Sequence, residues 1–115
     1  MKVLVIGLGS MGKRRIRNLQ SLGLRDIFGF DIKEAAAQEA KKMFGIKLIN
    51  NLENAAAYQF DFVVISTSPL QHLKFVKFCV KNKLPFFSEL NLITKDTIEI
   101  ERLARKSKIL GIPSN

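Results

Sequence analysis

A short apolar run leads directly into three closely spaced glycines at the start of this chain. Residues 3–6 are Val, Leu, Val and Ile, and Gly7, Gly9 and Gly12 follow in the pattern G-x-G-x-x-G. The spacing of apolar residues then predicts a helix over residues 10–22. A buried strand, a glycine-rich turn and a helix in this order are typical of a site that binds phosphate groups through backbone N–H groups.

The rest of the sequence alternates between apolar runs and helical segments. Strands are predicted at residues 3–6, 27–31, 46–49, 61–66, 85–89 and 109–112, and helices at 10–22, 33–44, 52–58, 70–83 and 94–106. The strand segments are continuous apolar runs, as in a sheet that is covered on both faces. The order therefore predicts one α/β domain with a doubly wound parallel sheet of about six strands and helices on both faces.

The charge balance narrows the choice of ligand. Nineteen basic and ten acidic residues give a formal net charge of +9, which raises the question of nucleic-acid binding. The basic residues are spread over both halves without a basic tail, so nucleic acid is disfavoured. A small anionic ligand or an acidic partner domain accounts for the charge as well. The single Cys79 fits a reducing compartment, and no apolar run reaches the roughly 20 residues of a membrane span. We therefore expect a cytoplasmic protein that is not in the membrane.

Each glycine of the motif has its own predicted role in binding a dinucleotide. Gly7 permits a tight turn, Gly9 lets the backbone approach a pyrophosphate, and Gly12 brings the helix close to the strand. The backbone N–H groups of Ser10, Met11 and Gly12 are predicted to point at the phosphates from the positive end of the helix. A glycine-rich turn that serves packing alone is the alternative.

The start of the same helix is basic. Lys13, Arg14 and Arg15 oppose the helix dipole at a cost of about 0.3–1 kcal/mol each at the surface. A bound pyrophosphate or an acidic partner surface would offset this cost. The alternative is a solvated basic face whose charges are screened by salt.

An acidic residue stands where a dinucleotide site needs one. Asp31 ends the second predicted strand, 19 residues beyond Gly12, and its carboxylate can accept hydrogen bonds from both ribose hydroxyls of the adenosine half. The carboxylate would repel the 2′-phosphate of NADP, so NAD is the favoured cofactor. Lys33 lies two residues further on and would partly restore NADP binding.

The later strands bring further polar residues to the same edge of the sheet. Ser66 and Thr67 end the fourth predicted strand, and ligands bind at the carboxyl ends of strands in such folds. His72 lies on the apolar face of the next helix, where a lone histidine is more often structural than catalytic. Glu89 ends the fifth predicted strand and should border the crevice.

Together these residues resemble the Gfo/Idh/MocA family, the group of glucose–fructose oxidoreductase and inositol dehydrogenase. The resemblance covers the whole chain and rests on "GLGSMG", on "FD" at the second strand, on Thr67 and His72, on Glu89 and on the closing "GIPSN". It implies that residues 1–115 are the N-terminal NAD(P)-binding Rossmann domain of a two-domain oxidoreductase. Such enzymes transfer hydride to or from a sugar, cyclitol or nucleotide sugar, and the substrate domain would be absent from this chain. The expected cofactor-binding residues are Gly7, Gly9, Ser10, Met11, Gly12, Asp31, Ser66, Thr67, His72 and Glu89.

One departure from the family bears on catalysis. The family usually has Glu-Lys-Pro at the fifth strand, whereas this chain has Glu89, Leu90 and Asn91. Leucine can take no part in proton transfer. Because neither a substrate domain nor a convincing acid–base pair is present, we expect no catalytic residue and cofactor binding without turnover by this chain alone. We also expect no metal ligand. The alternatives are a regulatory domain that senses nucleotides and an interaction scaffold with an empty crevice. The sequence does not choose between a monomer and a homo-oligomer.

Overall fold

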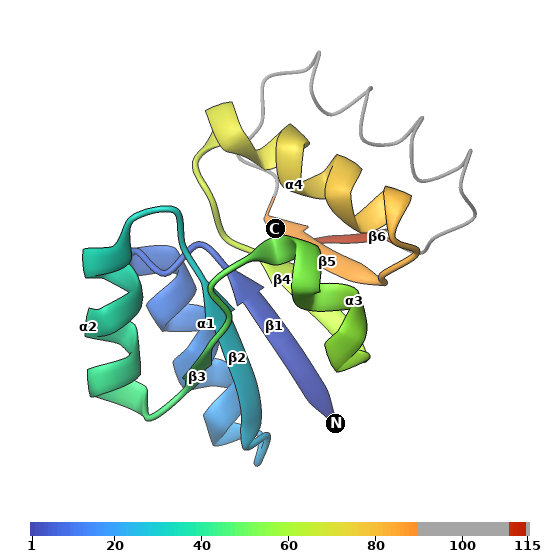
Figure 1. Ribbon diagram of the computed structural model, residues 1–115. Coiled ribbons are helices and arrows are strands. Elements are labelled where there is room, and N and C mark those ends of the chain that lie inside the picture. The colour runs from blue at the N-terminus through green and yellow to red at the C-terminus, as the bar shows by residue number, and fades with distance from the viewer. Residues whose placement is uncertain (90–110, 115) are drawn as a thin grey trace.

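The computed structural model describes residues 1–89 and 111–114, which form a parallel sheet with helices on both faces (Figure 1). Five strands come from the first 89 residues, and a sixth pairs with the last of them. The strands are β1 (Lys2–Ile6), β2 (Asp26–Phe30), β3 (Lys47–Leu48), β4 (Phe62–Ile65), β5 (Phe86–Glu89) and β6 (Gly111–Ser114). Their order across the sheet is β3-β2-β1-β4-β5-β6, and every neighbouring pair is parallel.

The helices lie on opposite sides of this sheet. They are α1 (Ser10–Ser21), α2 (Glu34–Phe44), the 3-10 turn η1 (Leu52–Asn54), α3 (Ala55–Tyr58) and α4 (Pro69–Lys81). Figure 1 shows α1 and α2 on one side of the sheet and α3 and α4 on the other. The structure therefore confirms the predicted doubly wound α/β architecture. None of the described helices is long and apolar enough to cross a membrane.

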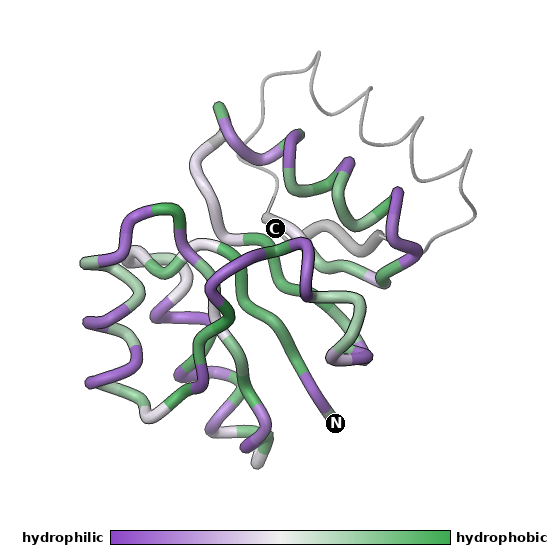
Figure 2. Tube along the Cα trace, in the orientation of Figure 1, coloured by the Kyte–Doolittle hydropathy of each residue, from purple (hydrophilic) through white to green (hydrophobic). Residues whose placement is uncertain are grey.

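Alternate side chains of the central strand supply two separate cores. Val3 and Val5 of β1 pack with the buried residues of α1 and α2, including Ile16 and Ala40. The intervening Leu4 and Ile6 pack on the other face, against residues of α3 and α4. Figure 2 shows continuous hydrophobic colouring along β1, in the middle of the fold. Along α2, hydrophobic and hydrophilic residues alternate. A strand buried on both faces explains why its sequence is a continuous apolar run.

Some strand boundaries differ from the predicted ones. The predicted strand 46–49 is reduced to Lys47 and Leu48, because only these two residues pair with β2. Ile46 and Ile49 lie outside the strand but are buried all the same, and the Ile49 N–H still donates to the Gly29 carbonyl oxygen of β2 at 3.0 Å. The last strand was predicted at 109–112 and is found at Gly111–Ser114. The predicted helix 94–106 lies outside the described residues.

The strand order reverses at β1, and this positions the site. The chain runs outward from β1 to β2 and β3 in one direction, then crosses back to β4 and continues to β5 and β6 in the other. In open parallel sheets, ligands bind in the crevice that this reversal leaves at the carboxyl ends of the strands. The loops after β1, β2 and β4 meet at that edge.

Candidate functional site

A groove of about 370 Å³ lies at the carboxyl ends of β1, β2 and β4. It is lined by Ile6, Gly7, Gly9, Asp31, Ile32, Lys33, Ala36, Ser66, Thr67, Ser68, Gln71 and Phe75. Five of the ten predicted cofactor-binding residues are among them, namely Gly7, Gly9, Asp31, Ser66 and Thr67. The groove is thus built from the first glycine turn, the end of β2 and the end of β4.

Two of the three motif glycines are required by the fold itself. Gly7 has a φ of +94°, and a Cβ atom on it would lie 2.6 Å from the Ser66 carbonyl oxygen. A Cβ atom on Gly12 would overlap the Gly7 carbonyl oxygen. Close packing of the turn against β4, and of α1 against the turn, therefore accounts for both residues.

Gly9 differs from the other two glycines. Its backbone is extended, with φ −78° and ψ −157°, and a Cβ atom on it would have no neighbour within 4 Å. Neither backbone strain nor packing among the described residues demands a glycine here. The open space in front of Gly9 fits the predicted close approach of a ligand to the backbone.

The first turn of α1 presents backbone N–H groups beside this open space. Gly9 is the N-cap, and the Lys13 N–H donates to the Gly9 carbonyl oxygen at 2.9 Å. The N–H groups of Ser10, Met11 and Gly12 precede this bond and have no acceptor within the helix. Gly9 has no side chain that could cap the helix, and the first turn contains no acidic residue. These groups are available to an anion, which the positive end of the helix favours.

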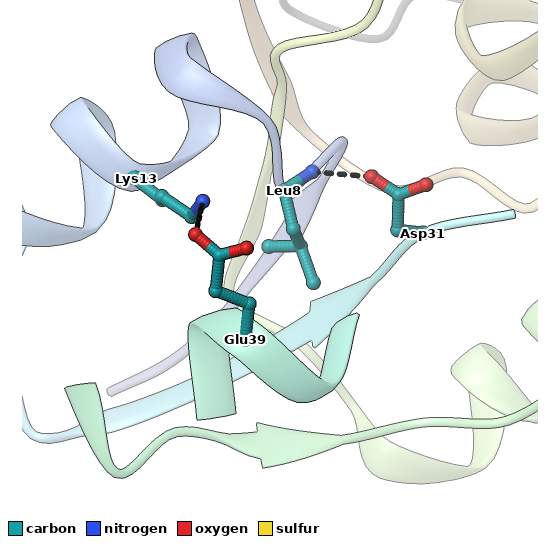
Figure 3. A network of polar contacts seen from close by, with 4 residues as sticks. All are labelled: Leu8, Lys13, Asp31 and Glu39. Atoms are coloured by element: carbon teal, nitrogen blue, oxygen red, sulfur yellow. Dashed lines mark hydrogen bonds and ion pairs between the residues drawn. The ribbon is translucent and has the colours of Figure 1, made fainter. Parts of the chain in front are cut away.

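Asp31 is the first residue after β2, and its carboxylate is held from two sides. Oδ2 accepts a hydrogen bond from the Leu8 N–H at 2.7 Å (Figure 3), and Oδ1 accepts one from the Lys33 N–H at 2.8 Å. A carboxylate has about four acceptor positions, so each oxygen can accept a further bond. Asp31 therefore lines the groove as a fixed acceptor with capacity for ligand hydroxyls.

Two of the three basic residues at the start of α1 have partners within the protein. Lys13 forms an ion pair with Glu39 of α2 (Figure 3), and the Arg15 guanidinium lies 5.7 Å from the centre of the Phe87 ring. Arg14 is exposed. None of the three lines the groove. The cost of placing these charges near a helix N-terminus is thus offset in part by Glu39 and Phe87, which the sequence did not indicate.

Ser66 and Thr67 carry hydroxyl groups without a partner in the described part of the chain. Their Oγ and Oγ1 atoms are buried, and neither makes a hydrogen bond to any residue that the structure describes. A buried hydroxyl without a partner costs about 1–3 kcal/mol. Both residues line the groove, so a polar group of a ligand could satisfy them there.

The structure separates His72 from the other predicted residues. His72 lies on α4 with 1% of its surface exposed and does not line the groove. Glu89 is the last residue of β5, where its backbone pairs with Ser114 of β6. Ser88 pairs with Ile65, so Glu89 and Ser66 follow at the same edge of the sheet. Leu90 and Asn91 lie outside the described residues.

Two contributors to the turn were not singled out from the sequence. Leu8 is fully buried between the first two glycines, and it packs where Gly29 leaves room on β2. A Cβ atom on Gly29 would lie 3.0 Å from Leu8 Cδ1 and 2.8 Å from Ile46 Cδ1. A glycine inside an otherwise apolar strand signals such a close approach, so "IFGFD" contained the information.

The remaining groove residues are mainly apolar or uncharged. Ile32, Ala36 and Phe75 provide apolar contact area, and Gln71 and Ser68 add polar groups at the start of α4. Asp31 and Lys33 are the titratable residues among the described lining residues. The part of the chain that the structure describes has no cluster of side chains suited to a metal ion.

Sequence comparison agrees with this geometry. Residues 1–110 match the profile of GFO_IDH_MocA, described as an oxidoreductase family with an NAD-binding Rossmann fold. No curated protein is similar enough in sequence to match the chain.

Solved structures share the fold. A probable dehydrogenase from Thermotoga maritima superposes with a TM-score of 0.84 at 23% identity, over 99% of this chain and 36% of its own. The WlbA dehydrogenase from Chromobacterium violaceum, in complex with NADH and UDP-GlcNAcA, superposes with a TM-score of 0.84 at 19% identity. The match covers 99% of this chain and 34% of the WlbA chain. GenD2 from gentamicin A biosynthesis, in complex with NAD, superposes with a TM-score of 0.82 at 20% identity. The match covers 99% of this chain and 34% of the GenD2 chain. The chain thus spans about a third of the length of these proteins.

Proposed function

Because this chain belongs to the Gfo/Idh/MocA family of oxidoreductases, whose Rossmann fold binds NAD, we propose that the groove between β1, β2 and β4 is its NAD site. The observation that carries the proposal is the open space at Gly9. Packing and backbone conformation explain Gly7 and Gly12. Among the described residues neither requires glycine at position 9, which leaves the backbone there open to a closely bound ligand.

Different residues of the described part of the chain bind the pyrophosphate, the adenosine ribose and the adenine. The N–H groups of Ser10, Met11 and Gly12 bind the pyrophosphate, assisted by the dipole of α1. Asp31 accepts hydrogen bonds from the hydroxyls of the adenosine ribose. The adenine lies against the apolar part of the groove, toward Ile32 and Phe75.

The end of β4 serves the other half of the cofactor. The hydroxyls of Ser66 and Thr67, which have no partner among the described residues, bind polar groups on the nicotinamide side. Glu89 is the last residue of β5, at the same edge of the sheet, and is assigned to this half of the cofactor. His72 is buried on α4 and does not line the groove, so it is assigned no direct contact with the cofactor.

The carboxylate at position 31 favours NAD over NADP. The negative charge would repel a 2′-phosphate, and both of its oxygens are already tied to backbone N–H groups. Lys33 lines the same groove and reduces this preference without reversing it.

The whole protein is proposed to be a dehydrogenase or related oxidoreductase. When bound, the nicotinamide supplies a hydride donor or acceptor. A sugar, cyclitol or nucleotide sugar is the proposed substrate, supported by the WlbA dehydrogenase structure with UDP-GlcNAcA. Substrate and acid–base groups would come from a second domain, and this chain alone would bind cofactor without turnover. We place the protein in the cytoplasm, in keeping with the free and buried Cys79.

Calorimetric titration of the chain with NAD and with NADP tests the proposal. We expect NAD to bind and NADP to bind at least about tenfold more weakly, a difference of about 1.4 kcal/mol. Titration with adenine alone is the control, because it lacks the pyrophosphate and should bind weakly or not at all. Failure of both dinucleotides to bind would refute the assignment of the groove.

A further inference from the structure

We propose that Asp31 is also a positioning residue, which holds the glycine-rich turn in its binding conformation through the Leu8 N–H. The proposal rests on the function proposed above and gives the same carboxylate a second role. The observation is the 2.7 Å hydrogen bond from the Leu8 N–H to Asp31 Oδ2 (Figure 3).

This bond continues the pairing of β1 and β2 beyond the end of both strands. The Gly7 N–H donates to the Phe30 carbonyl oxygen at 2.8 Å. At the next residue, where the chain turns at Gly7, the Leu8 N–H donates to the Asp31 side chain. The turn leaves the sheet at this point, and the Asp31 carboxylate holds its backbone there through the Leu8 N–H.

Leu8 is the residue through which such a bond controls the turn. It lies between Gly7 and Gly9, which have no side chains of their own to anchor them. The Leu8 side chain is fully buried beside Gly29. Its N–H would lose a charged acceptor if Asp31 were truncated, and hydrogen bonds to charged groups are stronger than neutral ones. The turn would then lose its hydrogen bond to Asp31, while it keeps the hydrogen bond from Gly7 to Phe30 of β2 and its apolar contact with Gly29.

Both oxygens of the Asp31 carboxylate accept hydrogen bonds from the backbone. Asp31 Oδ1 accepts the Lys33 N–H at 2.8 Å, next to the start of α2. Turning the side chain to admit a 2′-phosphate would break this bond and the bond to Leu8. It follows that Asp31→Ala does not simply convert an NAD site into an NADP site. The substitution removes a ribose acceptor and loosens the phosphate-binding turn together.

A ligand without ribose hydroxyls separates the two roles. ADP can bond to Asp31 through its ribose, whereas 2′,3′-dideoxy-ADP cannot and still needs the turn for its phosphates. Asp31→Ala and Asp31→Asn both remove the negative charge, but only Asn keeps an oxygen that can accept the Leu8 N–H. We expect Asp31→Ala to bind dideoxy-ADP about tenfold more weakly than Asp31→Asn. Equal affinities of the two variants would overturn the positioning role.

Asp61 offers a matched control at the amino ends of β1 and β4, away from the carboxyl ends that form the groove. Its Oδ2 accepts the Lys2 N–H at 2.7 Å, the same kind of bond at a place far from the groove. Asp61→Ala should bind both nucleotides like the wild type, within about twofold. A loss as large as that of Asp31→Ala would show that general destabilisation causes the effect, and would also overturn the proposal.

Hydrogen exchange of the Leu8 amide gives a readout that needs no ligand. The exchange should be slow in the wild type and in Asp31→Asn, and at least about tenfold faster in Asp31→Ala. If the wild type does not bind ADP, the proposed function fails, and the Leu8 exchange rates alone decide the positioning role. Equal rates in all three proteins would refute it.

Discussion

Gly7 and Ser66 are in direct contact where the glycine-rich turn meets the end of β4: a Cβ atom on Gly7 would lie 2.6 Å from the Ser66 carbonyl oxygen. This contact sets the distance between the two walls of the groove. The wall that presents the α1 N-terminus and the wall that carries the Ser66 and Thr67 hydroxyls are thereby held in register. A substitution at Gly7 would disturb the fold and the site at once.

Gly7→Ala should lower the free energy of unfolding by more than about 2 kcal/mol, because the new Cβ meets backbone that cannot move aside. Urea denaturation measures the change. Gly23→Ala is the matched control, since Gly23 has a similar φ of +89° but open space around it. That variant should lose only the conformational cost of about 1–2 kcal/mol. Equal losses at both positions would contradict the contact with Ser66.

Gly9→Ala should separate binding from stability. The side chain of alanine fits without a neighbour within 4 Å. Alanine is a poorer N-cap than glycine, but it restricts the unfolded chain, so the free energy of unfolding should change by less than about 1 kcal/mol. The affinity for NAD should fall at least about tenfold, because the methyl group occupies the space of the pyrophosphate. Unchanged affinity in calorimetry would favour the interaction scaffold with an empty crevice.

Ser66→Ala and Thr67→Val should weaken NAD binding without destabilising the protein. Both remove a buried hydroxyl that has no partner among the described residues, so the free energy of unfolding should stay the same or rise slightly. The affinity for NAD should fall about fivefold to tenfold for each. Ser21→Ala removes an exposed hydroxyl that bonds to the Asn18 carbonyl oxygen, and it should leave the affinity unchanged. Loss of stability in either groove variant would mean that the hydroxyl already has a structural partner.

Lys13→Gln should have little effect on the affinity for NAD. The ammonium group pairs with Glu39, whose side chain is 60% exposed, so the ion pair contributes at most about 1 kcal/mol to stability. The affinity for NAD should fall less than about threefold. A direct bond to phosphate would cost more than tenfold, because bonds between charged groups are stronger. Glu39→Gln is the companion variant, and its affinity should equal that of the wild type or exceed it slightly.

Cys79 should be unreactive in the folded protein. Burial raises the pKa of its thiol from 9.0 to about 12, so almost no thiolate is present at pH 8. A colorimetric thiol reagent should react only after the chain unfolds in urea. The raised pKa also has a consequence for stability. The folded state favours the protonated thiol, so this contribution is fully present below pH 9 and is lost as the pH rises toward 12. Rapid labelling of the native chain at pH 8 would contradict the burial of this group.

The fold was predictable because its main signals are local. Continuous apolar runs such as residues 62–65 correspond to strands buried on both faces, and the alternation with helices leaves few other topologies. Boundaries were less certain, because apolar residues show burial and not pairing. Ile46 and Ile49 are buried beside β3 without belonging to it, and the last strand lies two residues later than predicted.

The site was predictable as far as its residues follow strand ends. Gly7, Gly9, Asp31, Ser66 and Thr67 all line one groove, as their places in the sequence indicated. Side-chain pairings between elements were not visible in the sequence. The ion pair of Lys13 with Glu39 depends on how α1 and α2 pack side by side. The bond from Leu8 to Asp31 likewise joins residues whose relation only the folded turn defines.

The central claim is that NAD binds at the meeting point of the first turn of α1 and the end of β4. The most direct test is to follow the backbone amide resonances of the isotopically labelled chain during titration with NAD. The account predicts shifts concentrated at Gly9 to Gly12 and at Ser66 and Thr67, with residues at the opposite edge of the sheet, such as Lys2 and Asp61, unaffected. Shifts confined to other surfaces, or no shifts with saturating NAD, would contradict it.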